Sequence, residues 1–260
     1  IIHIGGGETT MGSSDESIRH SVSKLSSFHF VTHKEHKKRL IQLGENKKNI
    51  HIIGSPGIEN IKKTKVLKKK EVEKRLGFKF LRYNIVVNFY PLTNEKNKDE
   101  FYINQLLNSL SSLKNTRIIF TFPSFDIGSD IILKRIKLFV KNHKNTLTFK
   151  SLGSENYFSI LKYSNLVIGN SSSGLIEAPI IGTKVINIGD RQKNRIKPKE
   201  IIDVPCKSKE IKNAINLVMK KNIMYKNIYP NIKSSKKFAK ILSSLKLHHV
   251  LKKKFFDLKF

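Results

Sequence analysis

Cysteine and tryptophan are nearly absent from the chain. Its 260 residues include one cysteine, Cys206, and no tryptophan. A single thiol excludes both an internal disulfide framework and a metal site built from several cysteines. Apolar runs are short as well, because none approaches the ~20 residues that a membrane-spanning helix requires. No signal peptide is recognisable, so we expect a cytoplasmic protein without a membrane partner.

Acidic residues are scarce relative to basic ones. Lysine and arginine number 50 and aspartate and glutamate 20, which gives a formal net charge of +30. Such a balance is found in nucleic-acid-binding proteins, and also in proteins whose whole surface is rich in lysine. The lysines are scattered over all segments, and aromatic residues do not alternate with them as a base-stacking platform requires. We therefore favour a lysine-rich surface that attracts anionic ligands, without a nucleic-acid partner.

Histidines form no metal-binding pattern either. His33 and His36 lie three residues apart in a predicted helix, but no third ligand accompanies them. We expect no metal site.

Short apolar segments alternate with amphipathic ones, which is typical of a parallel β-sheet with helical crossovers. The expected strands are residues 1–4, 28–31, 51–53, 84–88, 116–122, 146–150, 167–168 and one from Val185. The expected helices are residues 13–25, 34–43, 71–76, 100–113, 130–142, 157–162, one from Leu175, 209–220 and 233–245. The basic stretch 62–70 marks a boundary. We divide the chain into a first domain (1–66), a second domain (67–232) and a terminal helix (233–260) that packs back towards the first.

The most informative stretch is VIGNSSSGLIEAP, residues 167–179. It predicts a buried strand, a turn of small polar residues and a helix capped by Ser173 or Gly174. Free N–H groups and hydroxyls at a helix start bind anions, and Glu177 one turn on can accept two hydrogen bonds from a ribose. That combination suits a nucleotide diphosphate. A purely structural alternative remains, in which Gly174 is the cap and Glu177 occupies the third helical position.

Two stretches together carry a resemblance to a known family. GNSSSGLIEAP (169–179) with NIGDRQ (187–192), and HIGGGETT (3–10) with DESIRH (15–20), resemble the hydrolysing UDP-N-acetylglucosamine 2-epimerases of sialic and legionaminic acid synthesis. The resemblance runs along nearly the whole chain. It implies an α/β fold of two Rossmann-like domains (GT-B-like) with the ligand between them. It also implies a UDP-sugar substrate, no cofactor and a homo-oligomer in the full-length protein.

The same resemblance suggests that the chain is truncated at its start. Ile1 lies in a predicted strand, whereas the family carries roughly another half-domain before this point. We therefore expect an N-terminally truncated chain that is inactive by itself.

Three carboxylates are candidate catalytic residues. Glu8 follows three glycines at the carboxyl end of a predicted strand, where ligands bind in open parallel sheets. Asp15 and Glu16 open the next predicted helix, whose Ile18, Val22 and Leu25 share one face. Neighbouring carboxylates can divide acid and base work between them. We prefer Asp15 over Glu16, because Ser13 and Glu16 have the spacing of a capping box.

Further candidate substrate-binding residues follow predicted strands. Tyr90 stands where the family usually has histidine, and can donate a hydrogen bond to phosphate or sugar. Ser124 stands where the family typically has asparagine. Arg191 would meet phosphate or a carboxylate. The remaining candidates are the residues of the helix start, Ser171, Ser172, Ser173, Gly174 and Glu177.

The resemblance implies a hydrolase that releases UDP by elimination and adds water to give a C2-inverted N-acetylhexosamine. The product would be N-acetylmannosamine or a diacetamido analogue. The alternatives are a non-hydrolysing epimerase or glycosyltransferase of the same fold, or an inactive homologue that binds sugar nucleotides.

Overall fold

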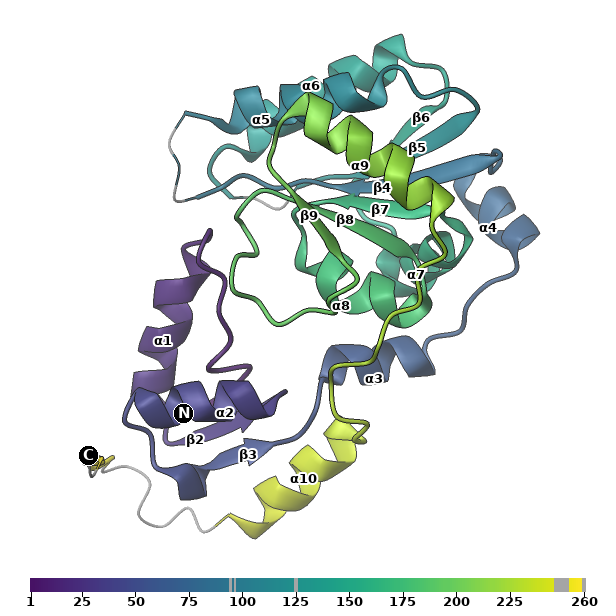
Figure 1. The fold of residues 1–260 in the computed structure, drawn as a ribbon. Helices are drawn as coiled ribbons and strands as arrows, with labels where there is room; N and C mark the ends of the chain where they lie inside the picture. Colours follow the sequence, from purple (N-terminus) through teal and green to yellow (C-terminus); the bar gives the residue numbers. More distant parts are fainter. Residues whose placement is uncertain (94, 96, 124–125, 246–252, 259–260) are drawn as a thin grey trace.

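The computed structural model describes residues 1–93, 95, 97–123, 126–245 and 253–258. Two sheets divide them into a smaller and a larger lobe (Figure 1). The smaller sheet has the strand order β1-β2-β3, and the larger one β6-β5-β4-β7-β8-β9. Every pairing in both sheets is parallel. The expected α/β fold of two Rossmann-like domains is confirmed, while the residue bounds of the domains stay a prediction.

The smaller lobe alternates strands and helices before the chain crosses to the larger lobe. Its elements are β1 (Ile2–Ile4), α1 (Asp15–Leu25), β2 (Phe28–Val31), α2 (Lys34–Gln42), a 3-10 turn (Lys47–Asn49) and β3 (Ile50–Ile52), followed by the connecting helix α3 (Pro56–Lys63). Leu40 of α2 packs with Val31 and Ile50 beneath it, which fixes this helix on the sheet.

The larger lobe continues the alternation to the end of the second sheet. Its elements are α4 (Lys69–Leu76), β4 (Tyr83–Asn88), α5 (Asp99–Leu110), β5 (Thr116–Thr121), α6 (Ser129–Asn142), β6 (Thr146–Phe149), α7 (Gly153–Tyr163), β7 (Leu166–Gly169), α8 (Ser172–Ile181), β8 (Lys184–Ile188), β9 (Ile202–Val204) and α9 (Ser208–Lys220).

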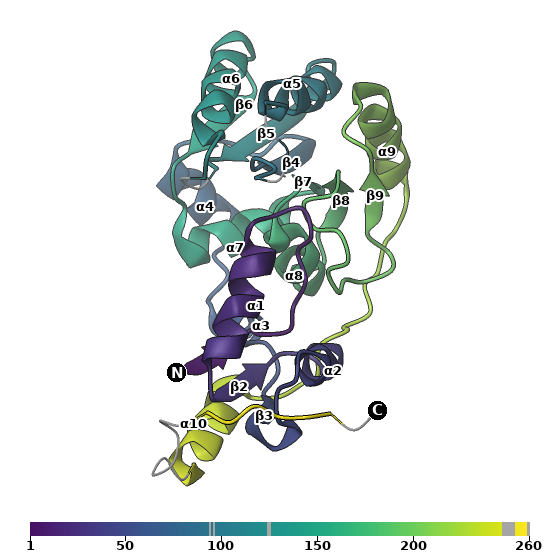
Figure 2. The ribbon, with the colours of Figure 1, turned by 90° about the vertical axis from the view of Figure 1, so that its left-hand side faces the viewer.

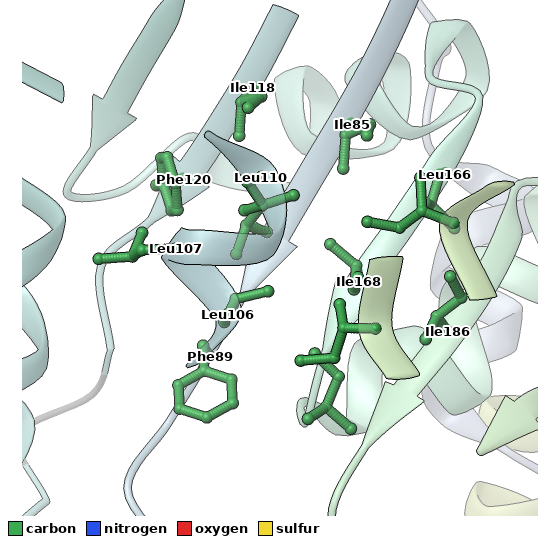
Figure 3. Packing of buried hydrophobic residues seen from close by; sticks show 14 of the residues in the cluster. Ile85, Phe89, Leu106, Leu107, Leu110, Ile118, Phe120, Leu166, Ile168 and Ile186 are labelled. Carbon is green, nitrogen blue, oxygen red and sulfur yellow. The ribbon is translucent and has the colours of Figure 1, made fainter. Parts of the chain in front are cut away.

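Alternate residues of each central strand face two separate cores. Ile85 and Val87 of β4 belong to the core covered by α5, α6 and α9, whereas Val86 belongs to the core covered by α4, α7 and α8. Figure 3 shows Ile85 in the first of these cores, together with Leu106 and Leu110 of α5. Such period-two burial on both faces explains why these strands read as continuous apolar runs in the sequence. The sheet therefore holds its strand ends rigidly, and the loops that follow them carry the polar residues.

The chain returns to the smaller lobe at its C-terminal end. Helix α10 (Ser234–Ser244) lies on the smaller sheet, where the Phe238 ring meets the Phe30 ring at 4.6 Å between centroids. Ser235 bonds to Glu59 of α3. Further on, Lys253 bonds to carbonyl oxygens at the end of α1 and to Glu45. The two lobes are thus connected by two crossings of the chain (Figure 1).

Three local predictions were wrong. No helix was expected at α3, yet Ser55 accepts a hydrogen bond from Ile58 N–H and Pro56 occupies the first helical turn, a common helix start. The short strand β9 was not predicted. The capping box does not form, because the Glu16 carboxylate accepts from Thr10 N–H instead of Ser13 N–H.

No described helix has both the length and the apolar character needed to cross a membrane.

Candidate active site between the two lobes

The strand order of the larger sheet reverses direction at its centre, between β4 and β7. Chain order runs outwards from β4 through β5 to β6, and then outwards again from β7 through β8 to β9. The loops after β4 and β7 therefore leave in opposite directions, which is the usual ligand position in an open parallel sheet. Tyr90 follows β4, and the serines that open α8 follow β7.

The helix α8 begins at Ser172, three residues before the expected start at Leu175. Ser171, and neither Ser173 nor Gly174, is the N-cap: it has extended backbone angles, and its hydroxyl accepts from Ser173 N–H at 3.2 Å. Gly169 just before it has φ +145, and a Cβ there would lie 2.0 Å from Asn88 O. Only glycine fits this approach of β7 to β4, so the turn that precedes α8 depends on it.

Asn170 fastens the two loops together. Its buried side chain accepts from Tyr90 N–H and donates to Tyr90 O, both at 2.7 Å. The backbone carbonyl of Asn170 accepts a hydrogen bond from the Gln192 side chain at 2.9 Å, which connects the loop after β8 to the other two loops. The three loops that carry Tyr90, Ser171 and Arg191 consequently form one rigid unit.

Arg191 lies in the middle of this unit. Its guanidinium lies 5.1 Å from the centre of the Tyr90 ring and donates to the carbonyls of Pro91 and Asn170. Burial lowers the pKa of Arg191, while the nearby carboxylates of Asp126 and Asp15 act against this. A half-desolvated cation beside a helix start is suited to a diphosphate.

The first lobe supplies a carboxylate directly to the loop after β8. Both oxygens of Glu8 accept from Arg195, at 3.1 and 2.8 Å, and both side chains are largely buried, with 16% and 11% exposed. The loop at Gly12 packs so closely on the same segment that a Cβ there would lie 2.5 Å from the Arg191 Cα. Glu8 is thereby held across the lobe interface, close to the loop that carries Arg191.

Asp15 and Glu16 have different surroundings. Asp15 is exposed at the start of α1 and contributes to the electrostatic environment of Arg191. Glu16 instead bonds Thr10 N–H and pairs with Arg19 at 3.6 Å and His20 at 3.3 Å, all within the first lobe. Figure 2 shows α1 directed from the smaller sheet towards the loops of the larger lobe. The structure thus brings Glu8 and Asp15 to the interface, whereas Glu16 braces its own loop.

The other predicted residues have mixed outcomes. Burial raises the pKa of Tyr90, while the Arg191 cation and the nearby hydroxyls of Ser171 and Thr121 act against this. Glu177 is half-exposed on α8. After burial, its negative charge is a further cause that raises the pKa of Tyr90 and of Tyr157. Ser124 lies outside the described residues. Ser172 and Gly174 lie in the first turn of α8, although the helix was expected to begin only at Leu175.

A cavity of about 640 Å³ opens beside this site, between α5 and the loops after β8 and β9. Phe89, Leu92, Asn187 and Gln192 are among its lining residues, but none of the described candidate residues lines it. The cavity thus borders the loop that carries Arg191, but Arg191 itself does not line it. Among the described residues, no group of histidine, cysteine, aspartate and glutamate side chains could hold a metal ion.

Comparison with known proteins decides the family. The profile of the family described as UDP-N-acetylglucosamine 2-epimerase matches residues 1–243. The chain belongs to this family.

Relatives of the chain are bacterial proteins about twice its matched length. Polysialic acid biosynthesis protein P7 of Escherichia coli is 44% identical over 218 residues, which cover 84% of this chain and 55% of that protein. The GDP/UDP-N,N'-diacetylbacillosamine 2-epimerase (hydrolyzing) of Campylobacter jejuni is 42% identical over 204 residues, which cover 78% and 53%. The chain thus spans about half the length of these curated relatives.

The fold is shared with solved epimerases. The Neisseria meningitidis UDP-GlcNAc 2-epimerase, solved with UDP-GlcNAc bound, superposes with a TM-score of 0.77 over 94% of this chain and 70% of that one, at 16% identity. At this identity the likeness concerns the fold alone.

Sequence reasoning missed several residues of the site. Arg195 lies four residues after Arg191, but nothing local indicates that it pairs with Glu8, 187 residues away. Tyr157 reads as one more aromatic of an amphipathic helix, yet its hydroxyl contacts Ser173. Asn170 and Gln192 lie inside the stretches that carry the family resemblance, and only the fold shows that they join the loops.

Proposed function

We propose that this chain provides the nucleotide-binding and catalytic groups of a hydrolysing UDP-sugar 2-epimerase. The substrate is a UDP-N-acetylhexosamine, and the products are UDP and the free sugar inverted at C2, either N-acetylmannosamine or a diacetamido analogue. The name of the C. jejuni relative supports the hydrolysing reaction and the second amide group on the sugar.

The reaction makes two demands on the site. A base removes the proton from C2 while the bond between C1 and the diphosphate oxygen breaks, so that UDP leaves with the bonding electrons. The remaining glycal has a double bond between C1 and C2. Water then adds its hydroxyl to C1, and a proton reaches C2 from the opposite face. The site must therefore place a proton-transfer group near C2 and stabilise the departing diphosphate.

The observation that carries the proposal is the meeting of both kinds of group at the lobe interface. The larger lobe contributes the start of α8 and Arg191, which suit the diphosphate. It also contributes Glu177, whose carboxylate would bind the ribose. The smaller lobe contributes Glu8, held by Arg195 on the loop that also bears Arg191, and Asp15, whose charge acts on Arg191. Glu8 and Asp15 are the proposed proton-transfer groups, and Tyr90 a hydrogen-bond donor to phosphate or sugar.

The test uses a chimera in which this chain replaces the matching part of a longer relative. In the C. jejuni protein the 204 matched residues are replaced by those of this chain, and UDP release from UDP-diacetamido sugar and UDP-N-acetylglucosamine is measured. Glu8→Gln and Asp15→Asn should lower turnover by ~10²–10⁴-fold, since a placed general base or acid contributes this much. The UDP affinity of both variants, measured by calorimetry, should remain unchanged, because the proposed UDP-binding groups belong to the larger lobe.

Glu16→Gln is the matched control, because the contacts of Glu16 with Thr10, Arg19 and His20 all lie within the first lobe. It should lower stability modestly and leave turnover largely intact. Wild-type turnover in Glu8→Gln contradicts the role of Glu8, and a collapse confined to Glu16→Gln means that the other carboxylates were chosen wrongly. Binding of UDP without any turnover identifies an inactive sugar-nucleotide-binding homologue instead. This alternative is considered because Tyr90 stands where the family usually has histidine.

A further inference from the structure

The guanidinium of Arg195 contacts two different side chains. Its Nε and Nη2 atoms donate to the two carboxylate oxygens of Glu8, at 3.1 and 2.8 Å. Its Nη1 atom donates to Oε1 of Gln192 at 3.0 Å. Because the guanidinium is planar and rigid, these three hydrogen bonds fix both its position and the edge that it presents to Glu8.

Gln192 connects Arg195 to the backbone just before α8. The residue is only 2% exposed, and its Nε2 atom donates to Asn170 O at 2.9 Å. A carbonyl only accepts and a guanidinium only donates, so the amide of Gln192 fits between them in one orientation alone. The same Asn170 carbonyl accepts from Arg191 at 3.4 Å. One backbone carbonyl is therefore shared by the cation suited to the diphosphate and the amide that leads to Glu8.

The ion pair leaves acceptor positions on Glu8. An ionised carboxylate has about four lone-pair positions on its two oxygens, and Arg195 occupies one on each oxygen. A second position on each oxygen can still take up a proton from a ligand. The pairing thus restricts the direction in which the carboxylate points without using all of its acceptor capacity.

We propose that Gln192 is a positioning residue for proton transfer: it holds the Arg195 guanidinium in the orientation that presents the Glu8 carboxylate to the sugar. The proposal rests on the proposed function, because Glu8 enters it as a proton-transfer group. It also deepens that function, because it assigns the orientation of Glu8 to a residue of the other lobe. Through the Asn170 carbonyl, the proton-transfer group and the start of α8 are held in a fixed relation across the lobe interface.

The first test measures kcat, KM and UDP affinity in the chimera. Gln192→Met keeps the length of the side chain and removes both of its hydrogen bonds. The kcat should fall about tenfold to a hundredfold, since a displacement of ~1 Å from the productive geometry can cost this much. KM and UDP affinity should change less than about twofold, because no group proposed to bind UDP is replaced. Lys193→Met is the matched control in the same loop, as its side chain is 56% exposed and pairs with Asp190.

Gln192→Glu separates positioning from the filling of space. Glutamate has nearly the same shape, but its carboxylate cannot donate to Asn170 O and competes with Glu8 for Arg195. At pH 8 its kcat should fall at least as far as that of Gln192→Met. Towards pH 5 the protonated side chain regains an O–H donor, so its loss relative to the wild type should shrink, whereas the loss in Gln192→Met should stay constant. A residue that only fills space would tolerate glutamate at every pH.

A second measurement observes Arg195 in the 260-residue chain without any turnover. Because both sides of its guanidinium are bonded, the group should rotate slowly about the Cζ–Nε bond and give separate NMR signals for its two Nη atoms. These signals should exchange faster in Gln192→Met and stay as in the wild type in Lys193→Met. Arg195→Lys, which lacks the signals, assigns them.

The outcomes distinguish this proposal from the proposed function. If Gln192→Met and Gln192→Glu keep the wild-type kcat while Glu8→Gln lowers it, the positioning role is overturned and the proposed function stands. The same conclusion follows if the loss in Gln192→Glu does not depend on pH, or if the Arg195 signals are unchanged in Gln192→Met. If Glu8→Gln turns over like the wild type, or if the chimera has no turnover at all, the proton-transfer role of Glu8 fails, and the role of Gln192 fails with it.

Discussion

At the scale of single residues, the site divides into groups with a local signal and groups without one. Ser171, Ser172 and Gly174 are small residues between a buried strand and a helix, a pattern that predicts an anion-binding turn by itself. Glu8 was recognisable as a carboxylate at a strand end. Its partner Arg195 was not, because an ion pair across 187 residues depends on how the two lobes meet and leaves no trace in spacing.

Glu177 gives the first residue-scale prediction. Its carboxylate lies one turn and a half inside α8, half-exposed, where it can bind the ribose diol. Glu177→Ala should weaken UDP binding by ~1–3 kcal/mol, the cost of losing a charged hydrogen-bond partner. The same variant should bind UDP and 2′-deoxy-UDP with equal affinity in calorimetry, whereas the wild type prefers UDP. Unchanged UDP affinity in a folded variant removes Glu177 from the site.

At the scale of elements, sequence periodicity located most strands and helices but misjudged their ends. The helix α8 begins three residues earlier than expected because Ser171, the first of three serines, has the extended backbone that a cap needs. Three serines in a row offer three equivalent caps, and only the position of β7 selects one. At α3 no helix was expected, although serine followed by proline is a common helix start.

Gly169 gives the element-scale prediction. A Cβ there would meet Asn88 O at 2.0 Å, and its φ is +145. Gly169→Ala should lower the free energy of unfolding by more than ~3 kcal/mol, because backbone strain and a backbone clash add together. Gly182→Ala is the matched control: its φ is +91, but no atom lies within 4 Å of an added Cβ. It should cost only ~1 kcal/mol, the strain without the clash. Equal losses in urea denaturation contradict the close approach of β7 to β4.

At the scale of the whole molecule, the two-lobe architecture followed from the alternation of strands and helices together with the family resemblance. The way the lobes are held together did not. Besides the Glu8 pair, Thr9 bonds Asn194 O at 2.7 Å and Ser14 N–H bonds Thr93 at 2.9 Å. These contacts join loops that are far apart in the chain, and no periodic pattern encodes them.

Buried histidines of the first lobe give a prediction about pH. Burial and nearby cations lower the pKa of His36 from its ordinary value of 6.5 to about 3. The unfolded chain therefore takes up a proton near pH 6.5 that the folded one does not, so stability is complete above pH 6.5 and falls as pH decreases. Between pH 6.5 and 5 the free energy of unfolding should decline by ~1 kcal/mol per pH unit from His36. Urea titrations of His36→Gln should show a shallower decline, and an equal slope contradicts this account.

The outer surface of the first lobe gives the last prediction. Among the described residues β1 pairs only with β2, which leaves its other edge open, and Ile4 is 50% exposed. The apolar face expected for α1 also points outward, with Ile18 59% and Leu25 68% exposed. An open strand edge beside an apolar stripe favours association between chains. The 260-residue chain should therefore self-associate at micromolar concentrations in sedimentation velocity, and Ile18→Lys with Leu25→Lys should shift it towards the monomer. Ile127→Lys, at a 93% exposed position of the other lobe, should leave the association unchanged. A monomeric wild type, or an equal shift in Ile127→Lys, would mean that this surface does not drive association.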